Sequence, residues 1–97
     1  MRNVIVQYKV KPARIEEHEA LIRAVFAELA SARPHGLRYA ALKQPDGQSF
    51  VHVAFIEGTE NPLQQIAAFK AFTADIADRC EVQPDTVTLT AIGSYGV

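Results

Sequence analysis

Three histidines are the side chains in this sequence best suited to acid–base or ligand chemistry. His52 is the most informative of them, because it lies in the largely apolar run Ser-Phe-Val-His-Val-Ala-Phe-Ile-Glu over 49–57. An imidazole in such surroundings could orient a ligand, carry a proton or stay neutral in a dry cavity. The alternative is a structural histidine that forms a hydrogen bond across a subunit interface. We predict that His52 contacts a ligand, and it is our candidate catalytic residue.

The other histidines and the single cysteine do not form a metal-binding motif. His18 lies at the edge of a helical stripe and is predicted to pack, whereas His35 lies in a Pro-His-Gly turn. The three histidines come from a strand, a helix and a turn, without the close spacing of a metal site. Cys80 has no partner for an internal disulfide, which suits a reducing cytoplasm. We expect no metal.

The segments that carry these residues alternate between strand and helix patterns. Alternating β-branched runs predict strands, and apolar residues three and four apart predict helices. Pro12 and Pro62 suit the first turn of a helix. The predicted strands cover 3–10, 37–43, 49–57 and 86–93, and the predicted helices run from Pro12 to about Ala32 and from Pro62 to about Arg79.

This βαββαβ order predicts an α+β, ferredoxin-like fold. Right-handed crossovers place both helices on one face of a four-stranded antiparallel sheet, with strand order 4-1-3-2. A chain of 97 residues has the size of one domain, so we expect residues 1–97 to form a single domain.

Both faces of the predicted sheet are apolar, although the helices can cover only one. By alternation, the uncharged helix-covered set is Val4, Val6, Tyr8, Val10, Leu37, Tyr39, Ala41, Val51, Val53, Phe55, Val87, Leu89 and Ala91. The second set is Ile5, Gln7, Arg38, Ala40, Leu42, Phe50, His52, Ala54, Ile56, Thr88, Thr90 and Ile92. A face in water should alternate to polar residues, and large exposed apolar patches are uncommon on monomers. We therefore predict a homodimer whose second subunit covers this face.

Two sheets packed in this way would enclose a mostly apolar space with a few polar groups, which is typical of a small-molecule pocket. Gln7 is central in its strand and either binds a ligand or pairs across the interface. Arg38 is near a strand end and is predicted at the pocket mouth.

Composition and local sequence exclude several other functions. The formal net charge of −1 lacks the basic surplus of nucleic-acid binders, and "QSFVHVAF" lacks the basic and aromatic signature of an RNA-recognition strand. The segment "YKVKPARIEE" lacks the glycine-rich, arginine-bearing loop of an acylphosphatase. There is no signal-peptide stretch and no apolar run of membrane length, so we expect a cytoplasmic protein without membrane contact.

The sequence resembles the dimeric α+β barrel superfamily, in particular the small antibiotic-biosynthesis-monooxygenase-like proteins. The resemblance rests on "VIVQYKVKPARIEEHEALI", "GLRYAALKQPDGQSFVHVAFIEG" and "AFKAFTADIADRC". It implies a homodimer, sheet against sheet, with a ligand cavity in each subunit. Known members oxidise polycyclic aromatic substrates without metal or flavin, degrade haem, or have no assigned activity. No cofactor is therefore expected.

Three positions depart from the catalytic members of that family. His52 stands where they carry an asparagine, Ile56 where they carry a tryptophan, and Leu42 where a histidine is often found. The predicted second helix also lacks a histidine that could bind haem. The resulting set of predicted substrate-binding residues is Gln7, Arg38, Leu42, Phe50, His52, Ile56 and Thr88.

Two functional hypotheses follow. In the first, the chain is a cofactor-independent monooxygenase-like enzyme that acts on a small hydrophobic or aromatic metabolite, in a pocket between the sheet and the helices or the dimer partner. His52 would then be an acid–base or orienting group. In the second, the chain binds such a molecule in the same pocket without catalysis.

Overall fold

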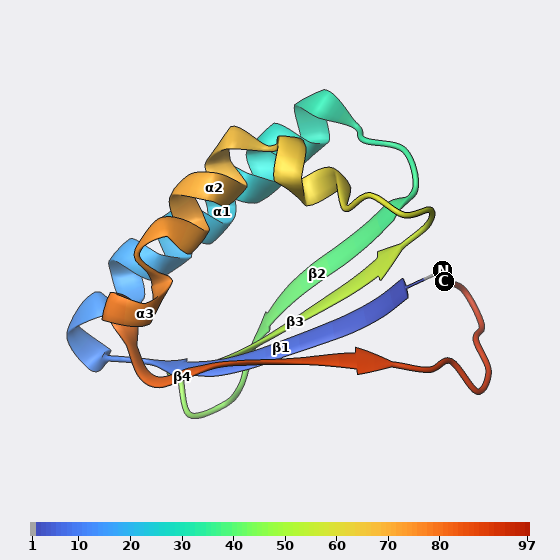
Figure 1. The fold of residues 1–97 in the computed structure, drawn as a ribbon. Coiled ribbons are helices and arrows are strands. Elements are labelled where there is room, and N and C mark those ends of the chain that lie inside the picture. Colours follow the sequence, from blue (N-terminus) through green and yellow to red (C-terminus); the bar gives the residue numbers. More distant parts are fainter. Residues whose placement is uncertain (1) are drawn as a thin grey trace.

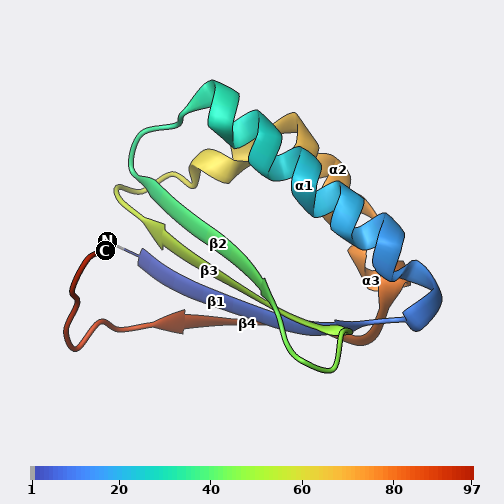
Figure 2. The same ribbon diagram turned by 180° about the vertical axis from the view of Figure 1, so that it is seen from behind.

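The computed structural model describes residues 2–97. Its strands form one four-stranded antiparallel sheet in the order β2-β3-β1-β4, and the helices lie together on one face of it (Figures 1 and 2). The elements are β1 (Arg2–Val10), η1 (Pro12–Arg14), α1 (Ile15–Ala32), β2 (Leu37–Lys43), β3 (Ser49–Ile56), η2 (Pro62–Gln65), α2 (Ala67–Ala74), α3 (Ile76–Arg79) and β4 (Cys80–Leu89). The predicted α+β arrangement and strand order are confirmed.

Polar side chains fix two turns of the structure. Asp46 accepts hydrogen bonds from the backbone N–H groups of Gln48 and Ser49, which closes the β2–β3 hairpin. The Oδ1 of Asn61 accepts from the N–H of Leu63 at 3.0 Å, the interaction expected of a capping residue before a proline. This cap opens η2, and α2 begins only at Ala67.

The second predicted helix is wrong in its continuity. The structure divides it into η2, α2 and α3, with a break at Asp75, whose φ of −121° is not helical. The α2 N-terminus is capped from another helix, because the carboxylate of Glu28 accepts from the N–H groups of Ala67 and Ala68. Cys80, which follows the predicted end of this helix, is the first residue of β4.

The last predicted strand, at 86–93, is wrong in its boundaries, because β4 runs from Cys80 to Leu89. Its pairing with β1 shifts register between Gln7 and Lys9 and again before Val10. β4 lies at the sheet edge, where a proline such as Pro84 leaves no ladder hydrogen bond unmade.

The sheet faces differ from the predicted ones in β3 and β4. Cross-strand pairs join Val6 with His52 and with Thr86, and Val4 with Ala54 and with Thr88. The helix-covered inner face therefore carries Val4, Val6, Tyr8, Leu37, Tyr39, Ala41, Phe50, His52, Ala54, Ile56, Thr86 and Thr88. The prediction failed because both alternations of β3 are apolar, so parity alone could not choose between them.

The corrected outer face is more apolar than the predicted one. Its hydrophobic members are Ile5, Ala40, Leu42, Val51, Val53, Phe55, Val87 and Leu89. Ile5 pairs with Val53 on one side and Val87 on the other, so these side chains are contiguous across the sheet. No helix of the described residues covers this face (Figures 1 and 2).

Candidate functional site

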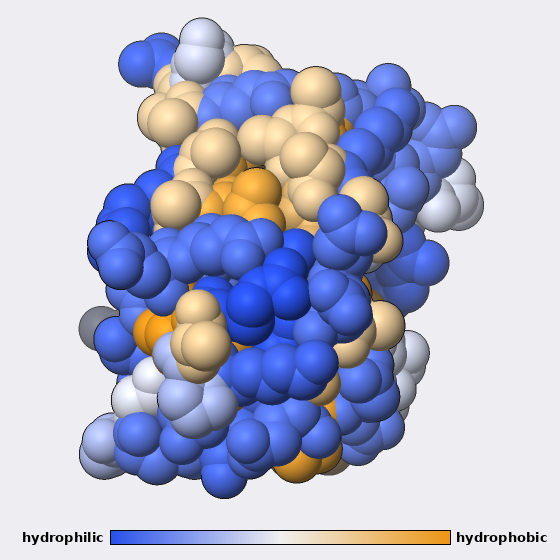
Figure 3. Space-filling model, turned by 90° about the vertical axis from the view of Figure 1, so that its left-hand side faces the viewer, coloured by the Kyte–Doolittle hydropathy of each residue, from blue (hydrophilic) through white to orange (hydrophobic). Residues whose placement is uncertain are grey.

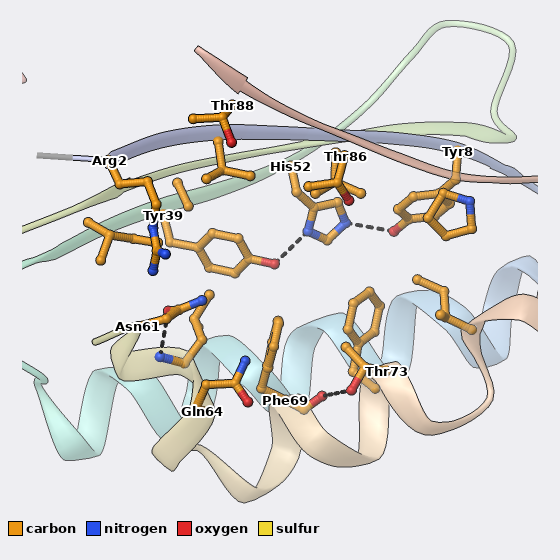
Figure 4. Close-up of a pocket in the computed structure, with 18 residues that line it drawn as sticks. Arg2, Tyr8, Tyr39, His52, Asn61, Gln64, Phe69, Thr73, Thr86 and Thr88 are labelled. Atoms are coloured by element: carbon orange, nitrogen blue, oxygen red, sulfur yellow. Dashed lines mark hydrogen bonds between the residues drawn. The ribbon is translucent and has the colours of Figure 1, made fainter. Parts of the chain in front are cut away.

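A cavity of about 570 Å³ lies between the inner face and α2. Apolar side chains form most of its wall, and its polar side chains come from the strands on one side and from η2 and α2 on the other (Figure 4). The residues that line it are Arg2, Val4, Val6, Tyr8, Tyr39, His52, Ala54, Ile56, Asn61, Leu63, Gln64, Phe69, Phe72, Thr73, Ile76, Pro84, Thr86 and Thr88. We call this space the inner cavity.

His52 lies on the cavity wall between two tyrosines (Figure 4). Its Nδ1 is 2.5 Å from the hydroxyl oxygen of Tyr39, and its Nε2 is 2.6 Å from that of Tyr8. Adjacent strands bring the three side chains together on one face, since Tyr39 is on β2, His52 on β3 and Tyr8 on β1. Both ring nitrogens of His52 are therefore engaged.

The hydrogen bonds continue from Tyr8 into the helices. The hydroxyl of Tyr8 is also 2.6 Å from Nε2 of His18 on α1. Nε of Arg79 donates to Nδ1 of His18 at 3.0 Å, and Nη2 of Arg79 donates to the carbonyl of Phe72. We call the five linked side chains the His–Tyr chain: Arg79, His18, Tyr8, His52 and Tyr39.

The His–Tyr chain is shielded from water at its arginine end. His18 is 0% exposed, Arg79 1% and His52 5%. The guanidinium of Arg79 packs on the ring of Phe72, with 5.5 Å to its centroid, and no carboxylate of residues 2–97 forms an ion pair with it. The surface at this end of the molecule is mainly hydrophilic with smaller hydrophobic areas (Figure 3).

Burial keeps every titratable ring in the chain neutral. It lowers the pKa of His52 to about 4. Burial also lowers the pKa of His18 to about 4, and the positive charge of Arg79 adds to that effect. The pKa values of Tyr8 and Tyr39 are raised, chiefly by burial. The site is therefore an uncharged hydrogen-bond chain with one fixed charge, Arg79, at its far end.

The structure brings together only some of the predicted substrate-binding residues. His52, Ile56 and Thr88 line the inner cavity, and Phe50 packs beside the chain, stacked on Tyr8 with ring centroids 5.6 Å apart. Gln7, Arg38 and Leu42 lie on the outer face, with Leu42 55% exposed, so the prediction that they share a pocket with His52 is wrong. The pocket lies on the helix side of the sheet.

Sequence reasoning assigned the remaining members of the His–Tyr chain to other roles. Tyr8 and Tyr39 were placed correctly on the helix-covered face but were expected only to pack, and His18 was expected to be a packing residue. Arg79 was not singled out at all. The sequence held one signal. Tyr8 and Tyr39 were both predicted on the helix-covered face, and His18 was predicted on the helix that covers it, so their polar atoms could contact one another in the core.

Two further features bear on what the site can hold. Among residues 2–97, no group of three or more histidine, cysteine, aspartate or glutamate side chains is placed to hold a metal ion. None of the described helices is both long and apolar enough to cross a membrane.

Solved structures with the same fold span nearly the whole chain. A Nitrosomonas europaea protein provisionally named an antibiotic biosynthesis monooxygenase has a TM-score of 0.78 and 20% identity, covering 96% of this chain and all (100%) of its own. A similarly named Caulobacter crescentus protein gives 0.70 and 21%, covering 95% and 90%. SnoaB, a cofactor-independent oxygenase from Streptomyces nogalater, gives 0.69 and 17%, covering 99% and 97%.

These likenesses establish the fold of the chain, which is that of the antibiotic biosynthesis monooxygenase-like structures. No family model matches the sequence, and no curated protein sequence matches it either. Activity therefore has to be argued from the site.

Proposed function

We propose that the chain binds a small hydrophobic or aromatic metabolite in the inner cavity and oxidises it with molecular oxygen, as a cofactor-independent monooxygenase. The observation that carries this proposal is an apolar cavity of about 570 Å³ whose wall ends on His52 and two tyrosine hydroxyls. Small-molecule pockets are typically about 300–1,000 Å³ and mostly apolar, with a few placed polar groups. The shared fold with an oxygenase that needs no cofactor supports the reaction class.

The reaction we propose is the oxidation of an activated ring methylene, as in an anthrone. The methylene loses two hydrogens and gains one oxygen atom as a new carbonyl, while the second atom of O₂ leaves as water. The substrate supplies four electrons and O₂ accepts them. His52 is the proposed orienting group. It acts on the substrate through the hydroxyl of Tyr39, because both its ring nitrogens face tyrosines.

The alternative is a binding protein without turnover. The same observation favours it, since His52 has no unengaged nitrogen with which to take a proton from a ligand directly. A general base must first lie within hydrogen-bond reach of the proton that it removes, whatever its pKa.

We also propose that a second copy of the chain covers the outer face. Its contiguous hydrophobic side chains include Leu42, Val87 and Leu89, which are 55%, 42% and 43% exposed in the single chain. Exposed apolar patches of this kind mark interaction surfaces. The inner cavity then lies wholly within each subunit, and the dimer serves to stabilise the sheet.

The test is an aerobic assay with anthrone, which follows oxygen uptake and product mass, together with calorimetric titration of the non-oxidisable shape analogue 9-fluorenone. Oxygen uptake that requires the protein and falls at least roughly tenfold in His52→Leu, the loss of about 1.4 kcal/mol, supports the enzyme. Binding of 9-fluorenone without oxygen uptake favours the binding protein. Failure of both ligands to bind would remove the cavity as the functional site.

A further inference from the structure

We infer that the His–Tyr chain is polarised in one direction and ends in a free O–H donor of Tyr39, so that the inner cavity selects a ring-shaped ligand bearing a hydrogen-bond-accepting oxygen. The inference rests on the proposed function in one respect, namely that the ligand occupies the inner cavity.

Arg79 sets the direction. A guanidinium has only N–H donors and does not lose its proton in proteins. Its Nε lies 3.0 Å from Nδ1 of His18, so this nitrogen must be the acceptor. A neutral imidazole has one donor and one acceptor nitrogen, and buried His18 beside a fixed positive charge is neutral. The proton of His18 is therefore on Nε2.

Each following bond is then determined. Nε2–H of His18 donates to the hydroxyl oxygen of Tyr8. Tyr8 is 4% exposed, and its hydroxyl contacts only the two imidazoles, so its own proton finds an acceptor only on Nε2 of His52. His52, also neutral, must carry its proton on Nδ1 and donate it to the hydroxyl oxygen of Tyr39. Every donor in the chain points from Arg79 towards Tyr39.

The opposite direction is disfavoured at the Arg79 end of the chain. It would put a proton on Nδ1 of His18 against the N–H of Arg79, with two donors facing each other and no acceptor between them. A second proton on His18 would not relieve this clash, because Nδ1 would still carry its proton, and it would place a new charge in a buried site beside the guanidinium of Arg79. Burial without a partner is costly for any charge.

The chain leaves one unused donor. The hydroxyl oxygen of Tyr39 receives a proton from His52, and its own proton has no acceptor among residues 2–97. Tyr39 stacks on Phe26 of α1, with ring centroids 5.1 Å apart, and its ring lines the inner cavity (Figure 4). The half-buried Tyr39 lies at the cavity wall, so a carbonyl or enolate oxygen of a bound ligand can accept this unused O–H. An enolate gains most, because donors aimed at a developing negative charge act strongly in a dry site.

The first experiment tests the polarity without any ligand. Two-bond ¹H–¹⁵N correlation spectra of the ¹⁵N-labelled protein at pH 7 report which nitrogen of each imidazole carries the proton. We expect opposite tautomers, with the proton on Nε2 in His18 and on Nδ1 in His52. A proton on Nε2 of His52, or a charged ring at either position, would overturn the inference.

The second experiment tests the selection with two three-ring probes of matched shape, 9-fluorenone, which has a carbonyl, and fluorene, which has a methylene there. We expect 9-fluorenone to bind roughly tenfold more tightly, the equivalent of one net hydrogen bond. Tyr39→Phe should remove this preference and leave the affinity for fluorene unchanged. Thr86→Val, which deletes another cavity-lining hydroxyl, is the matched control and should retain it.

A third variant separates the directed chain from a local contact. Tyr8→Phe leaves Tyr39 intact but removes the donor that forces the tautomer of His52. We expect a lower population of the Nδ1–H form and a smaller preference for 9-fluorenone. Equal affinities for the two probes in the unaltered protein would refute the selection while leaving the cavity as a binding site. Absence of binding by both probes would instead count against the proposed function, and the tautomer measurement would still decide the polarity.

Discussion

Both faces of the sheet are rich in apolar side chains, but the polar side chains on the two faces differ in their hydrogen bonding. On the inner face, His52, Tyr8 and Tyr39 are linked to one another and to the helices by hydrogen bonds. On the outer face, Gln7 and Arg38 are exposed and form no side-chain hydrogen bond with another residue of 2–97. The polar side chains of the inner face are hydrogen-bonded to one another, whereas those of the outer face can form hydrogen bonds only with water or with a partner.

This difference indicates what each face is for. A buried polar chain that is hydrogen-bonded at every member, with one donor left at its cavity end, is retained against its desolvation cost and is a sign of a built site. An apolar face with scattered polar residues needs only a complementary surface.

The largest effect is expected from matched arginine truncations. Arg79→Ala leaves Nδ1 of His18 and the carbonyl of Phe72 without their donor. The unfolding free energy should fall by about 2–6 kcal/mol, because each unsatisfied buried acceptor costs about 1–3 kcal/mol. Arg38→Ala on the outer face should change it by no more than about 0.5 kcal/mol. Urea denaturation of both variants measures the two unfolding free energies. An equal decrease in both variants would show that the hydrogen bonds of Arg79 in the His–Tyr chain add no particular stability.

A charge in the centre of the outer face tests the proposed dimer. Val53 pairs with Ile5 and with Ala40 at the middle of the sheet. The native protein should have a mass near twice 10.7 kDa by light scattering. Val53→Asp should yield a monomer, because burying an unpaired carboxylate costs about 3 kcal/mol or more. Ala20→Asp, on an exposed position of α1, should remain a dimer.

A native protein of single-chain mass would contradict the dimer directly. So would a Val53→Asp variant that keeps the native mass and stability. Neither outcome bears on the inner cavity, because the outer face lies on the opposite side of the sheet.

The fold was predictable because its signals are local and agree with one another. Pro12 and Pro62 each indicated the start of a helix by their own chemistry, and the spacing of the apolar residues indicated the strands and helices. The division of the second predicted helix was not predictable. Its break at Asp75 has no proline or glycine to mark it, and the cap at the start of α2 comes from Glu28 of α1. Contacts between segments that are distant in the sequence do not alter the spacing of apolar residues within either segment.

The site was only partly predictable for a related reason. His52 was identified by its apolar neighbours, but its face was not, because Val51, Val53 and Phe55 are as apolar as the residues on the other alternation. Its burial is explained by two hydroxyls on neighbouring strands. Register decides whether such groups meet, and a shift of one residue moves every side chain to the other face.

The smallest expected effect is on the pH dependence of the unfolding free energy, to which the inner histidines contribute in a pH range of their own. The pKa values of His18 and His52 are about 4 in the folded chain, whereas an unperturbed histidine has 6.5. Between these values the unfolded chain binds more protons than the folded one, so stability falls as pH falls from 6.5 towards 4. From pH 7 to pH 5, each histidine should lower the unfolding free energy by about 2 kcal/mol.

Replacement of one inner histidine should therefore flatten the profile. His52→Gln is expected to be less stable than the native chain at pH 7, yet to lose about 2 kcal/mol less between pH 7 and pH 5. Arg38→Ala should follow the native profile. The exposed carboxylates with lowered pKa, such as Glu17 and Asp78, titrate below this window and do not obscure it. Parallel profiles for His52→Gln and the native chain would mean that His52 takes up its proton without unfolding, and the chain it belongs to would then be open to water.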